Sequence, residues 1–441
     1  MNTKLTIGTG SSAVVRTCQI CEAPGLEPVL FLGYLPPVNT MPKVGETPRE
    51  QPAYPALLLR CPCCQLVQLG LVVDPAILFP PEYPYTSAST KILRENFAQL
   101  AMECRELIPT QPQDLVVDIG ANDGTLLSNF MANHRVQGIE PADVGNLANK
   151  RGIPTLISFF NADAVAKVRA EKGVAKIITA TNVFAHIEDV HSVVKNLVSL
   201  LAPDGVFISE SHYLHSLIET LQYDTIYHEH LRYYSLHSLQ YLLKMHGLEV
   251  FHARRIPTHG GSIRVYAARV GTQLIRPSVA KMLAEEQSFS VSRESLKKFK
   301  RRVTLSKLQL HGVLQDLKGQ GARIYGVGAP SRASTLINYV GLDDGILDCV
   351  VEISGSHKIG KCIPGTLIPV VDEARLFSDQ PEYALLLSWH IAEELIPKLA
   401  ARGFKGDFII PLPTPHILSY DPQTSRTTRV EKTAALDLAK V

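Results

Sequence analysis

Two pairs of cysteines with the spacing C-x-x-C stand near the start of the chain, Cys18 with Cys21 and Cys61 with Cys64. The surrounding residues, 1–80, are rich in proline and turn residues and hold only short apolar runs, too few to form a core alone. A structural zinc ion takes four ligands in a tetrahedron and contributes on the order of 10 kcal/mol to folding. The spacing therefore predicts a zinc-binding domain rather than four unrelated reduced cysteines.

The charge and hydropathy of the 441-residue chain exclude several classes of partner. Its 44 basic and 42 acidic residues give a formal net charge of +2, too small to attract nucleic acid or an anionic membrane surface. No stretch approaches the roughly 18 consecutive apolar residues of a membrane span, and no apolar run follows the polar N-terminus. We therefore expect a cytoplasmic protein with reduced cysteines, two to four domains, and neither nucleic-acid nor membrane partners.

Strand and helix patterns alternate through the middle of the chain. A helical pattern over 91–107 precedes a predicted strand over 115–119, a glycine-bearing turn and a predicted helix from Thr125. Further strands are predicted over 136–139 and 175–179, and the alternation continues to about residue 270. This order is typical of a doubly wound, Rossmann-like parallel sheet.

A second α/β unit is predicted after a long connecting helix over 278–317. A short strand over 323–326 enters the turn 326–332, and a helix over 333–340 follows. Strands near 348–352 and 383–388 complete the unit. The predicted domains are 1–80 for zinc, 81–275 for the central α/β domain, 276–420 for the C-terminal α/β domain with its connecting helix, and 421–441 for a flexible tail.

The turn from Asp118 to Gly124, DIGANDG, follows a buried strand and predicts a nucleoside site. Glycine lets a charged ligand approach the backbone closely, and Glu140, about twenty residues later, can accept both hydrogen bonds of an adenosine ribose. An acidic turn disfavours a pyrophosphate but suits the positive groups of S-adenosylmethionine. NAD would require a complete G-x-G-x-x-G, which is absent, and a turn without a ligand is the remaining alternative.

The segment from Asp224 to His230, DTIYHEH, gathers a phenol, two imidazoles and two carboxylates. A neutral imidazole can remove a proton, a carboxylate can orient it, and a phenol can donate to a developing oxyanion. These groups suit removal of a hydrogen next to a ketone. If the segment is a strand, His228 and His230 share a face and could bind a metal, but a metal site needs three or four ligands and no further pair lies nearby.

A second glycine-rich turn, His259 to Arg264, leads into a predicted strand. Its backbone amides, Ser262 and Arg264 could meet a diphosphate or sugar hydroxyls. A plain hairpin bend is the alternative.

In the order in which they occur, these segments make nearly the whole chain resemble the three-domain sugar C-methyltransferase family. Members of that family have an N-terminal zinc-binding domain and methylate C-3 of nucleotide-linked 4-keto-deoxysugars. Each motif alone is modestly specific, but their order is highly so. The matching segments are the two cysteine pairs, 83–87, 118–124, 182–186, 227–230, 259–264, 326–332 and 358–369.

The resemblance implies specific ligands for two cofactors. The zinc ligands would be Cys18, Cys21, Cys61 and Cys64, with Cys63 a bystander. The residues that would bind S-adenosylmethionine are Asp118, Gly120, Ala121, Asn122, Gly124, Glu140, Pro141 and Asn182.

The resemblance also implies the catalytic residues. His230 would be the base, with His186 the second choice, and Tyr227 and Glu229 would flank the sugar. A tyrosine of the segment 83–85 would lie near the ketone, and Tyr85 is preferred to Tyr83. The substrate-binding residues would be Tyr83, Tyr85, His259, Gly260, Ser262, Arg264 and Arg332.

The C-terminal domain of this family repeats the α/β fold, lacks a second methyl-donor site, and helps to close over the nucleotide-sugar. Here Trp389 is followed by His390 where asparagine is expected, and Glu352 stands where aspartate is usual. These departures leave thymidine and guanosine diphosphate both open as carriers.

The sequence thus predicts an S-adenosylmethionine-dependent C-methyltransferase that acts on a nucleotide-diphosphate sugar as a monomer or weak homo-oligomer. An O- or N-methyltransferase is one alternative. A zinc-knuckle adaptor that binds a nucleotide without turnover is another, although the near-neutral charge speaks against it.

Overall fold

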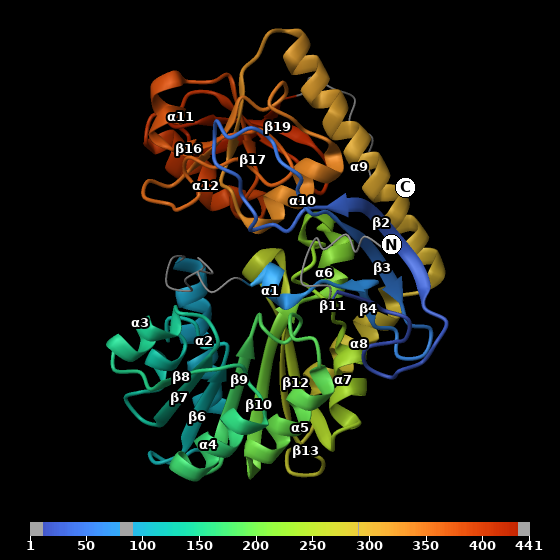
Figure 1. Ribbon diagram of the computed structural model, residues 1–441, viewed down its shortest axis with the longest axis vertical. Coiled ribbons are helices and arrows are strands. Elements are labelled where there is room, and N and C mark those ends of the chain that lie inside the picture. Colours follow the sequence, from blue (N-terminus) through green and yellow to red (C-terminus); the bar gives the residue numbers. More distant parts are fainter. Residues whose placement is uncertain (1–11, 80–90, 290, 431–441) are drawn as a thin grey trace, which may run out of the picture.

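The computed structural model describes residues 12–79, 91–289 and 291–430, and Figure 1 shows three parts in it. A small N-terminal sheet adjoins two larger α/β domains, one from the middle of the chain and one from its C-terminal third. The predicted Tyr83 and Tyr85 lie outside the described residues. No described helix is both long enough and apolar enough to cross a membrane.

The N-terminal domain is a four-stranded antiparallel sheet. Across the sheet its strands are β11 (Arg232–Tyr233), β4 (Val67–Leu69), β3 (Tyr54–Arg60) and β2 (Glu27–Leu35). The outermost of these, β11, comes from the middle domain and begins two residues after His230. Its pairing with β4 therefore ties the predicted catalytic segment to the zinc-binding domain. The smaller elements are β1 (Ala13–Val14), β5 (Leu71–Val72) and helix α1 (Pro75–Leu78).

The middle domain is built on a seven-stranded sheet. In order across the sheet, the strands are β8 (Thr155–Ile157), β7 (Arg135–Glu140), β6 (Leu115–Ile119), β9 (Ala175–Thr181), β10 (Leu201–His212), β13 (Ser262–Arg269) and β12 (Leu248–Ile256). The first five are parallel, and β13 runs antiparallel to both of its neighbours, β10 and β12, so that β12 has the direction of the first five. The strand order reverses between β6 and β9, so a ligand is expected at the carboxyl ends of these two strands.

Helices flank this sheet, as burial of both faces of a parallel sheet requires. They are α2 (Lys91–Leu107), α3 (Gly145–Lys150), α4 (Ala162–Lys172), α5 (Val190–Leu200) and α7 (Leu236–Lys244). Helix α6 (Leu214–Glu219) instead packs in one core with the N-terminal sheet. The helix predicted over 91–107 and the strand predicted over 115–119 are confirmed with those bounds.

The C-terminal domain repeats the same plan. Its strands, in order across the sheet, are β16 (Val370–Asp372), β15 (Cys349–Glu352), β14 (Ile324–Val327), β17 (Tyr383–Leu386), β18 (Asp407–Ile410), β19 (His416–Asp421) and β20 (Arg426–Val430). Again five strands are parallel, and the sixth, β19, runs antiparallel to both of its neighbours, β18 and β20. The order reverses between β14 and β17, which makes these strands the counterparts of β6 and β9.

The remaining helices connect the domains and cover the second sheet. They are α8 (Pro277–Phe289), α9 (Arg293–Gly319), α10 (Ser331–Val340), α11 (Ala374–Asp379) and α12 (Ala392–Ala401). The long helix α9 runs along one side of the molecule in Figure 1. Its apolar face, including Val303, joins Leu30 and Leu58 of the N-terminal sheet in one core with the C-terminal domain.

The helix predicted from Thr125 is wrong, because only one 3-10 turn, η2 (Leu127–Asn129), forms there. The Asp123 carboxylate accepts the N–H and the hydroxyl of Thr125 at 3.1 and 2.7 Å. The Asn129 amide donates to the Thr125 carbonyl at 3.0 Å. Polar side chains that bond to the nearby backbone in this way compete with helical hydrogen bonds.

Two other predicted boundaries are also corrected. The single connecting helix is two helices, α8 and α9, because Ser292 caps the second and its Oγ accepts the Ser295 N–H at 3.2 Å. The predicted flexible tail contains β20, which pairs with β19. Residues 431–441 of that tail lie outside the described residues.

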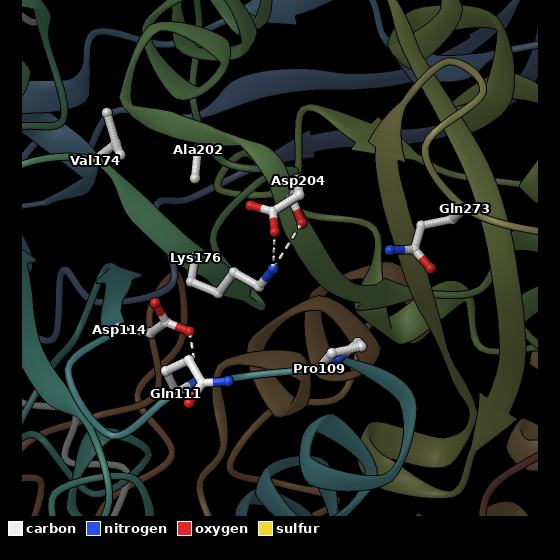
Figure 2. A pocket seen from close by; sticks show the side chains of 8 residues that line it. All are labelled: Pro109, Gln111, Asp114, Val174, Lys176, Ala202, Asp204 and Gln273. Carbon is white, nitrogen blue, oxygen red and sulfur yellow. Dashed lines mark hydrogen bonds and ion pairs between the residues drawn. The ribbon is translucent and has the colours of Figure 1, made fainter.

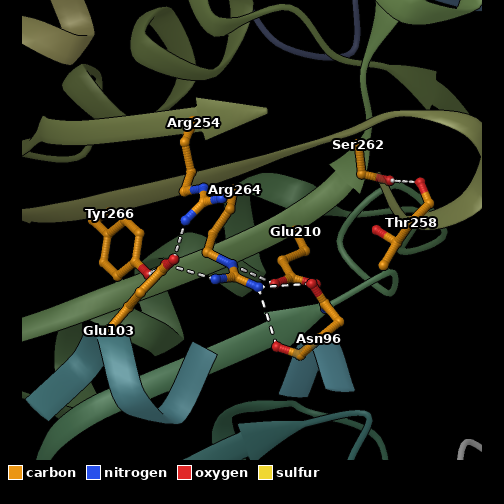
Figure 3. Close-up of polar contacts among 8 residues, drawn as sticks. All are labelled: Asn96, Glu103, Glu210, Arg254, Thr258, Ser262, Arg264 and Tyr266. Atoms are coloured by element: carbon orange, nitrogen blue, oxygen red, sulfur yellow. Dashed lines mark hydrogen bonds and ion pairs between the residues drawn. The ribbon is translucent and has the colours of Figure 1, made fainter. Parts of the chain in front are cut away.

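Arg264 does not face a ligand, contrary to the prediction from its glycine-rich turn. It lies on β13 directly opposite Glu210 of β10, and its side chain is fully buried. Its nitrogens donate to Glu210 at 2.5 Å, to Glu103 at 2.6 Å and to the Asn96 side chain at 2.8 Å. Figure 3 shows these partners converging on the guanidinium from β10 and α2. The positive charge of Arg264 is thus compensated by carboxylates inside the domain, and its guanidinium is not available to a diphosphate.

This buried network predicts the effect of Arg264→Met. The variant leaves the Glu103 and Glu210 carboxylates buried without their cation, which costs about 3–5 kcal/mol when one partner of such a pair is removed. Urea unfolding followed by circular dichroism should show a loss of that size. Lys398→Met is the matched control, because its ion pair with Glu394 is exposed and contributes less than about 1 kcal/mol. Equal effects of the two variants would contradict the assignment.

Candidate active site

The four predicted zinc ligands lie together. The sulfur atoms of Cys18 and Cys64 are 3.4 Å apart, as are those of Cys21 and Cys61, and all four lie within 4.8 Å of one another. A zinc ion with Zn–S bonds of about 2.3 Å needs sulfur atoms at such spacing. Cys63, by contrast, is exposed and its sulfur lies 3.9 Å from the Tyr241 hydroxyl. Four thiolates of this geometry fit a structural zinc ion.

The turn after β6 lies where the strand order reverses, at the edge of the middle sheet where a ligand crevice is expected. Gly120 has a φ of +73°, and a Cβ there would stand 2.4 Å from Val183 Cγ2, so no other residue fits without a shift. A Cβ at Gly124 would meet Ile153 at 2.7 Å. At both positions, therefore, the neighbouring side chains leave no room for a Cβ.

Acidic groups surround this crevice. The two carboxylate oxygens of Glu140, the last residue of β7, accept the N–H groups of Asn122 and Ala142, each at 2.9 Å. Asp118 accepts the Thr179 hydroxyl at 2.6 Å, and burial raises the pKa of Asp118 to about 7. A pKa near 7 leaves Asp118 only partly ionised near neutral pH, so the two carboxyl groups chiefly offer hydrogen-bond acceptors to the hydroxyl and ammonium groups of a ligand.

The remaining predicted cofactor residues line the same edge of the sheet. Asn182, directly after β9, has a φ of +57° and a buried Oδ1 without a hydrogen-bond partner among the described residues. An unpartnered buried acceptor is costly, so a ligand donor is expected beside it. Ala121 is buried within the turn, and Pro141 is exposed directly after Glu140. These features fit the predicted methyl donor.

His230 is oriented by the backbone. Its Nδ1–H donates to the Thr225 carbonyl at 2.7 Å, which leaves the lone pair on Nε2. Ring centroids of Tyr227, His212 and His186 lie 4.2, 4.7 and 5.0 Å from that of His230. The structure thus brings the predicted base and its second choice together.

These imidazoles are neutral near pH 7. Burial and the neighbouring His186 hold the pKa of His230 well below its usual value. Burial also lowers the pKa of His186 and of His259 to about 4, and that of His212 well below 6.5. A neutral imidazole has the lone pair that a base requires.

His212 was missed by the sequence analysis. It ends β10, and its ring lies between those of His230 and His259, 4.7 and 5.4 Å away. A polar residue at the carboxyl end of a buried parallel strand is a recognisable signal, because ligands bind at that edge.

The condition for the metal alternative, a strand with His228 and His230 on one face, is not met, because both residues lie in a turn after η3 (Tyr223–Thr225). The ring of His228 packs against Tyr54, 5.8 Å between centroids, and not against His230. Among the described residues, the group that could hold a metal is the four cysteines. The metal alternative for the two histidines is therefore unsupported.

Other domains contribute to the same cluster. Glu229 accepts the Asn39 side-chain amide of the N-terminal domain at 2.6 Å, a contact for which the sequence holds no local signal. From the C-terminal domain, Lys358 lies close enough to Glu229 and Glu352 to feel both charges, although burial lowers the pKa of Lys358. The site is thus assembled from all three domains.

Arg332 joins two domains rather than standing free for a substrate. Its Nε and Nη2 donate to the Asp224 carboxylate, each at 2.8 Å, and its guanidinium lies 5.0 Å from the Trp389 ring centroid. Trp389 Nε1 donates to the same carboxylate at 2.8 Å. The predicted substrate contact of Arg332 is therefore corrected to a contact between domains.

The residues of the turn at His259 that were predicted to bind substrate differ in their surroundings. His259 has a φ of +56° and its ring reaches the histidine cluster, and a Cβ at Gly260 would stand 2.8 Å from Gln222 Oε1. Ser262 is fully buried and donates to the Thr258 carbonyl at 3.0 Å, as Figure 3 shows. Thus His259 lies at the cluster, whereas Ser262 is used within the turn itself.

A separate hollow of about 350 Å³ lies at the opposite edge of the middle sheet. Figure 2 shows Asp114, Lys176 and Asp204, which stand at or beside the amino ends of β6, β9 and β10. Lys176 donates to Asp204 at 2.6 Å, so its charge is compensated locally. The strands separate this hollow from the histidine cluster.

Family models match the three parts of the chain. A zinc-binding domain model covers residues 18–79, a methyltransferase domain model covers 92–253, and a C-methyltransferase C-terminal domain model covers 257–413. These matches agree with the predicted cofactors, a structural zinc ion and S-adenosylmethionine. They also agree with the predicted Rossmann-like fold.

One relative decides the family. The chain is 33% identical over 412 residues to the C-methyltransferase NovU of Streptomyces niveus, covering 92% of this chain and 97% of that protein. The chain belongs to the C-methyltransferase family. It is therefore an enzyme of the methyltransferase class, and the adaptor alternative is wrong.

Solved structures resemble only part of this C-methyltransferase family member. A complex of the Haloferax volcanii Trm112 methyltransferase activator with its methyltransferase partner has a chain with 14% identity, a TM-score of 0.33, and coverage of 40% of this chain and 92% of that one. Magnesium protoporphyrin IX methyltransferase of Synechocystis PCC 6803, with bound SAM, has 15% identity and a TM-score of 0.30, with coverage of 40% and 77%. The family assignment rests on NovU and the family models.

The cysteine geometry predicts that Cys64→Ser lowers the zinc content of the purified protein and its unfolding temperature. The wild type should hold one zinc ion per chain at this cluster, measured by mass spectrometry of the metal. Cys63→Ser is the control, because this exposed thiol lies outside the tetrahedron and should keep its zinc. A zinc-free wild type, or equal zinc loss in both variants, would contradict the site.

Proposed function

We propose that this enzyme methylates C-3, next to the ketone, of a nucleotide-diphosphate-linked 4-keto-6-deoxysugar, with S-adenosylmethionine as donor. The observation that carries the proposal is the orientation of His230. Its imidazole is neutral, its Nδ1–H donates to the Thr225 carbonyl, and its Nε2 keeps the lone pair. A base oriented in this way suits removal of a hydrogen made acidic by a neighbouring ketone. O- and N-methyl transfer form no enolate, so they do not need a base beside a carbon next to a ketone.

The two α/β domains each have a glutamate beside their glycine turn, but only the C-terminal turn also has a lysine beside it. The middle-domain crevice holds Asp118, Glu140 and the turn at Gly120, which suit a cationic ligand. S-adenosylmethionine, when bound there, supplies an electrophilic methyl group. Asn182 and Ala121 would lie beside it, and Asn122 and Gly124 shape the turn.

The C-terminal crevice supports an anionic ligand. Gly328 has a φ of +81°, and a Cβ there would stand 2.7 Å from Ser388 Oγ, so the turn after β14 requires glycine as the turn after β6 does. Lys358 donates to the Ala329 carbonyl at 2.6 Å and so places an ammonium beside this turn. A nucleoside diphosphate would meet this positive charge there, with its sugar toward Glu229 and His230.

In the proposed reaction, Nε2 of His230 removes the C-3 proton, and the C–H electron pair forms the enolate with the adjacent carbonyl. Tyr227, whose ring lies 4.2 Å from that of His230, would flank the sugar with Glu229. Donors near the ketone stabilise the negative charge that develops on its oxygen. Tyr85, or alternatively Tyr83, remains the proposed donor to the ketone, and His186 and His212 complete the polar wall around the base.

The proposed function predicts the result of incubation in deuterated water with S-adenosylmethionine and thymidine- or guanosine-linked 4-keto-6-deoxysugars. Mass spectrometry should show the gain of one methyl group and loss of the C-3 hydrogen. Without the donor, the C-3 hydrogen should still exchange with solvent. Donor binding without any methylated or exchanged sugar would favour an O- or N-methyltransferase instead.

The base assignment predicts that His230→Gln lowers kcat by about 10²- to 10⁴-fold, the usual contribution of a general base. Donor affinity, measured by calorimetry, should change little, because the donor crevice is formed by other residues. His237→Gln is the control, since this exposed histidine lies outside the cluster. Full turnover in His230→Gln would exclude His230 as the base.

The pKa of His230 predicts the acid side of the pH profile. Burial and the charge of His186 lower this pKa, so His230 keeps its lone pair until the pH falls well below 6.5. The value of kcat/KM for C-3 hydrogen exchange should therefore decline with falling pH only in that lower range. Circular dichroism at each pH separates this decline from acid unfolding, and an acid limb at or above pH 6.5 would contradict the environment assigned to the base.

A further inference from the structure

The connection between β2 and β3 leaves the N-terminal sheet and lies against the C-terminal domain. It comprises residues 36–53, and Figure 1 shows it in blue over that domain. The Val44 N–H donates to the Gly360 carbonyl at 2.9 Å. The Cys362 N–H donates to the Pro42 carbonyl at 2.7 Å. The connection is therefore fixed by backbone hydrogen bonds to the C-terminal domain.

A tight turn in this connection contains Asn39. The Thr40 N–H donates to the Pro37 carbonyl at 3.1 Å, and the Met41 N–H donates to the Asn39 carbonyl at 3.2 Å. The ring of Pro37 fixes its φ, which restricts the other conformations open to the turn. Met41 packs against the core that the N-terminal sheet shares with the C-terminal domain. The backbone on both sides of Asn39 is thus restrained.

The side chain of Asn39 contacts the middle domain. Its Nδ2–H donates to Oε1 of Glu229 at 2.6 Å, a short distance typical of hydrogen bonds to an ionised acceptor. A carboxylate only accepts hydrogen bonds, so the amide must turn its nitrogen toward Glu229. Asn39 is half-buried and Glu229 is buried, so water competes little for this bond. A neutral amide orients the carboxylate and leaves its negative charge in place.

Glu229 lies beside two other groups of the candidate active site. It directly precedes His230 in the chain, and Lys358 of the C-terminal domain feels its charge. Lys358 begins the turn that the β2–β3 connection binds, because the Lys361 N–H donates to the Lys358 carbonyl at 3.1 Å and Gly360 lies between them. One connection of the N-terminal domain therefore contacts both Glu229 and the turn with Lys358.

We propose that Asn39 is a positioning residue for methyl transfer, which fixes the Glu229 carboxylate beside the sugar. The zinc-binding domain then takes part in the reaction through this hydrogen bond, in addition to its packing. The inference rests on the proposed nucleotide-sugar substrate, which Glu229 would flank. Asn39 itself exchanges no proton and forms no bond to the substrate. Its removal would let the carboxylate turn away from the reacting sugar.

The test compares Asn39→Leu with the wild type, both full-length and zinc-loaded, in methyl transfer to thymidine- and guanosine-linked 4-keto-6-deoxysugars. The kcat/KM for the sugar should fall at least about tenfold, the effect expected for loss of a hydrogen bond to a charged group. The loss should lie mainly in kcat, because a misplaced group acts on the transition state. S-adenosylmethionine affinity and zinc content should stay unchanged, because the residues proposed for both lie elsewhere.

Gln51→Leu is the matched control in the same connection. Gln51 Oε1 accepts the Gly365 N–H of the C-terminal domain at 3.3 Å, a contact of the connection outside the histidine cluster. This variant should keep kcat/KM close to that of the wild type. Equal losses in Asn39→Leu and Gln51→Leu, or a loss in Asn39→Leu that is matched by weaker donor binding, would show a structural role and overturn the inference.

A double-mutant cycle with Glu229→Gln tests whether Asn39 acts through that carboxylate. C-3 hydrogen exchange over long incubations is the readout, so that slow variants remain measurable. Asn39→Leu should add little further loss in the Glu229→Gln background, whereas a fully additive loss would overturn the inference.

The same assays separate this inference from the proposed function. A wild type that neither methylates nor exchanges any of these sugars would overturn both together. A wild type that methylates the sugar while Asn39→Leu is as active as Gln51→Leu would overturn the role of Asn39 alone.

Discussion

The buried carboxylate of Asp224 is the contact on which the active site depends. It receives Arg332 and Trp389 of the C-terminal domain, and both partners of the ion pair are almost completely buried. A buried charge is tolerated only when it is paired and hydrogen-bonded, so the two domains are fixed in register at this point. The next residue, Thr225, provides the carbonyl that orients His230. The contact that fixes the two domains and the contact that orients the proposed base therefore come from neighbouring residues.

The repeated fold explains how one cleft can bring two unlike ligands together. Both sheets reverse their strand order beside a glycine turn with a glutamate next to it, but only the turn at Gly328 also has a cation, Lys358, beside it. Electrostatic complementarity favours a cation in the first crevice and an anion in the second. The zinc-binding domain contacts the same region by pairing β4 with β11, which begins two residues after His230, and by the contact of Asn39 with Glu229.

Local sequence patterns predicted the features that depend on neighbouring residues. The helix over 91–107, the strand over 115–119 and the gathering of the four cysteines follow from periodicity and spacing. The resemblance to the three-domain sugar C-methyltransferases, read from the order of the motifs, is confirmed at the level of the C-methyltransferase family.

The site residues whose predicted roles failed have partners distant in the sequence, whereas the helix predicted from Thr125 failed because of local contacts with Asp123 and Asn129. Arg264 was predicted to bind the substrate because it follows a glycine turn. In the structure its guanidinium instead donates to Glu210 of β10 and Glu103 of α2. Arg332 is likewise used by Asp224, more than a hundred residues earlier. His212 was overlooked because only the assembled sheet brings the end of β10 beside His230.

The central claim is that His230 stands between a donor crevice in the middle domain and an acceptor crevice in the C-terminal domain. A crystal structure with S-adenosylhomocysteine and a nucleoside diphosphate bound together tests this most directly. The account predicts that S-adenosylhomocysteine lies over Gly120 beside Glu140 and that the nucleotide lies over Gly328 beside Glu352. It also predicts that His230 Nε2 faces the space between the two ligands. A nucleotide bound in the middle-domain crevice, or outside the cleft, would contradict it.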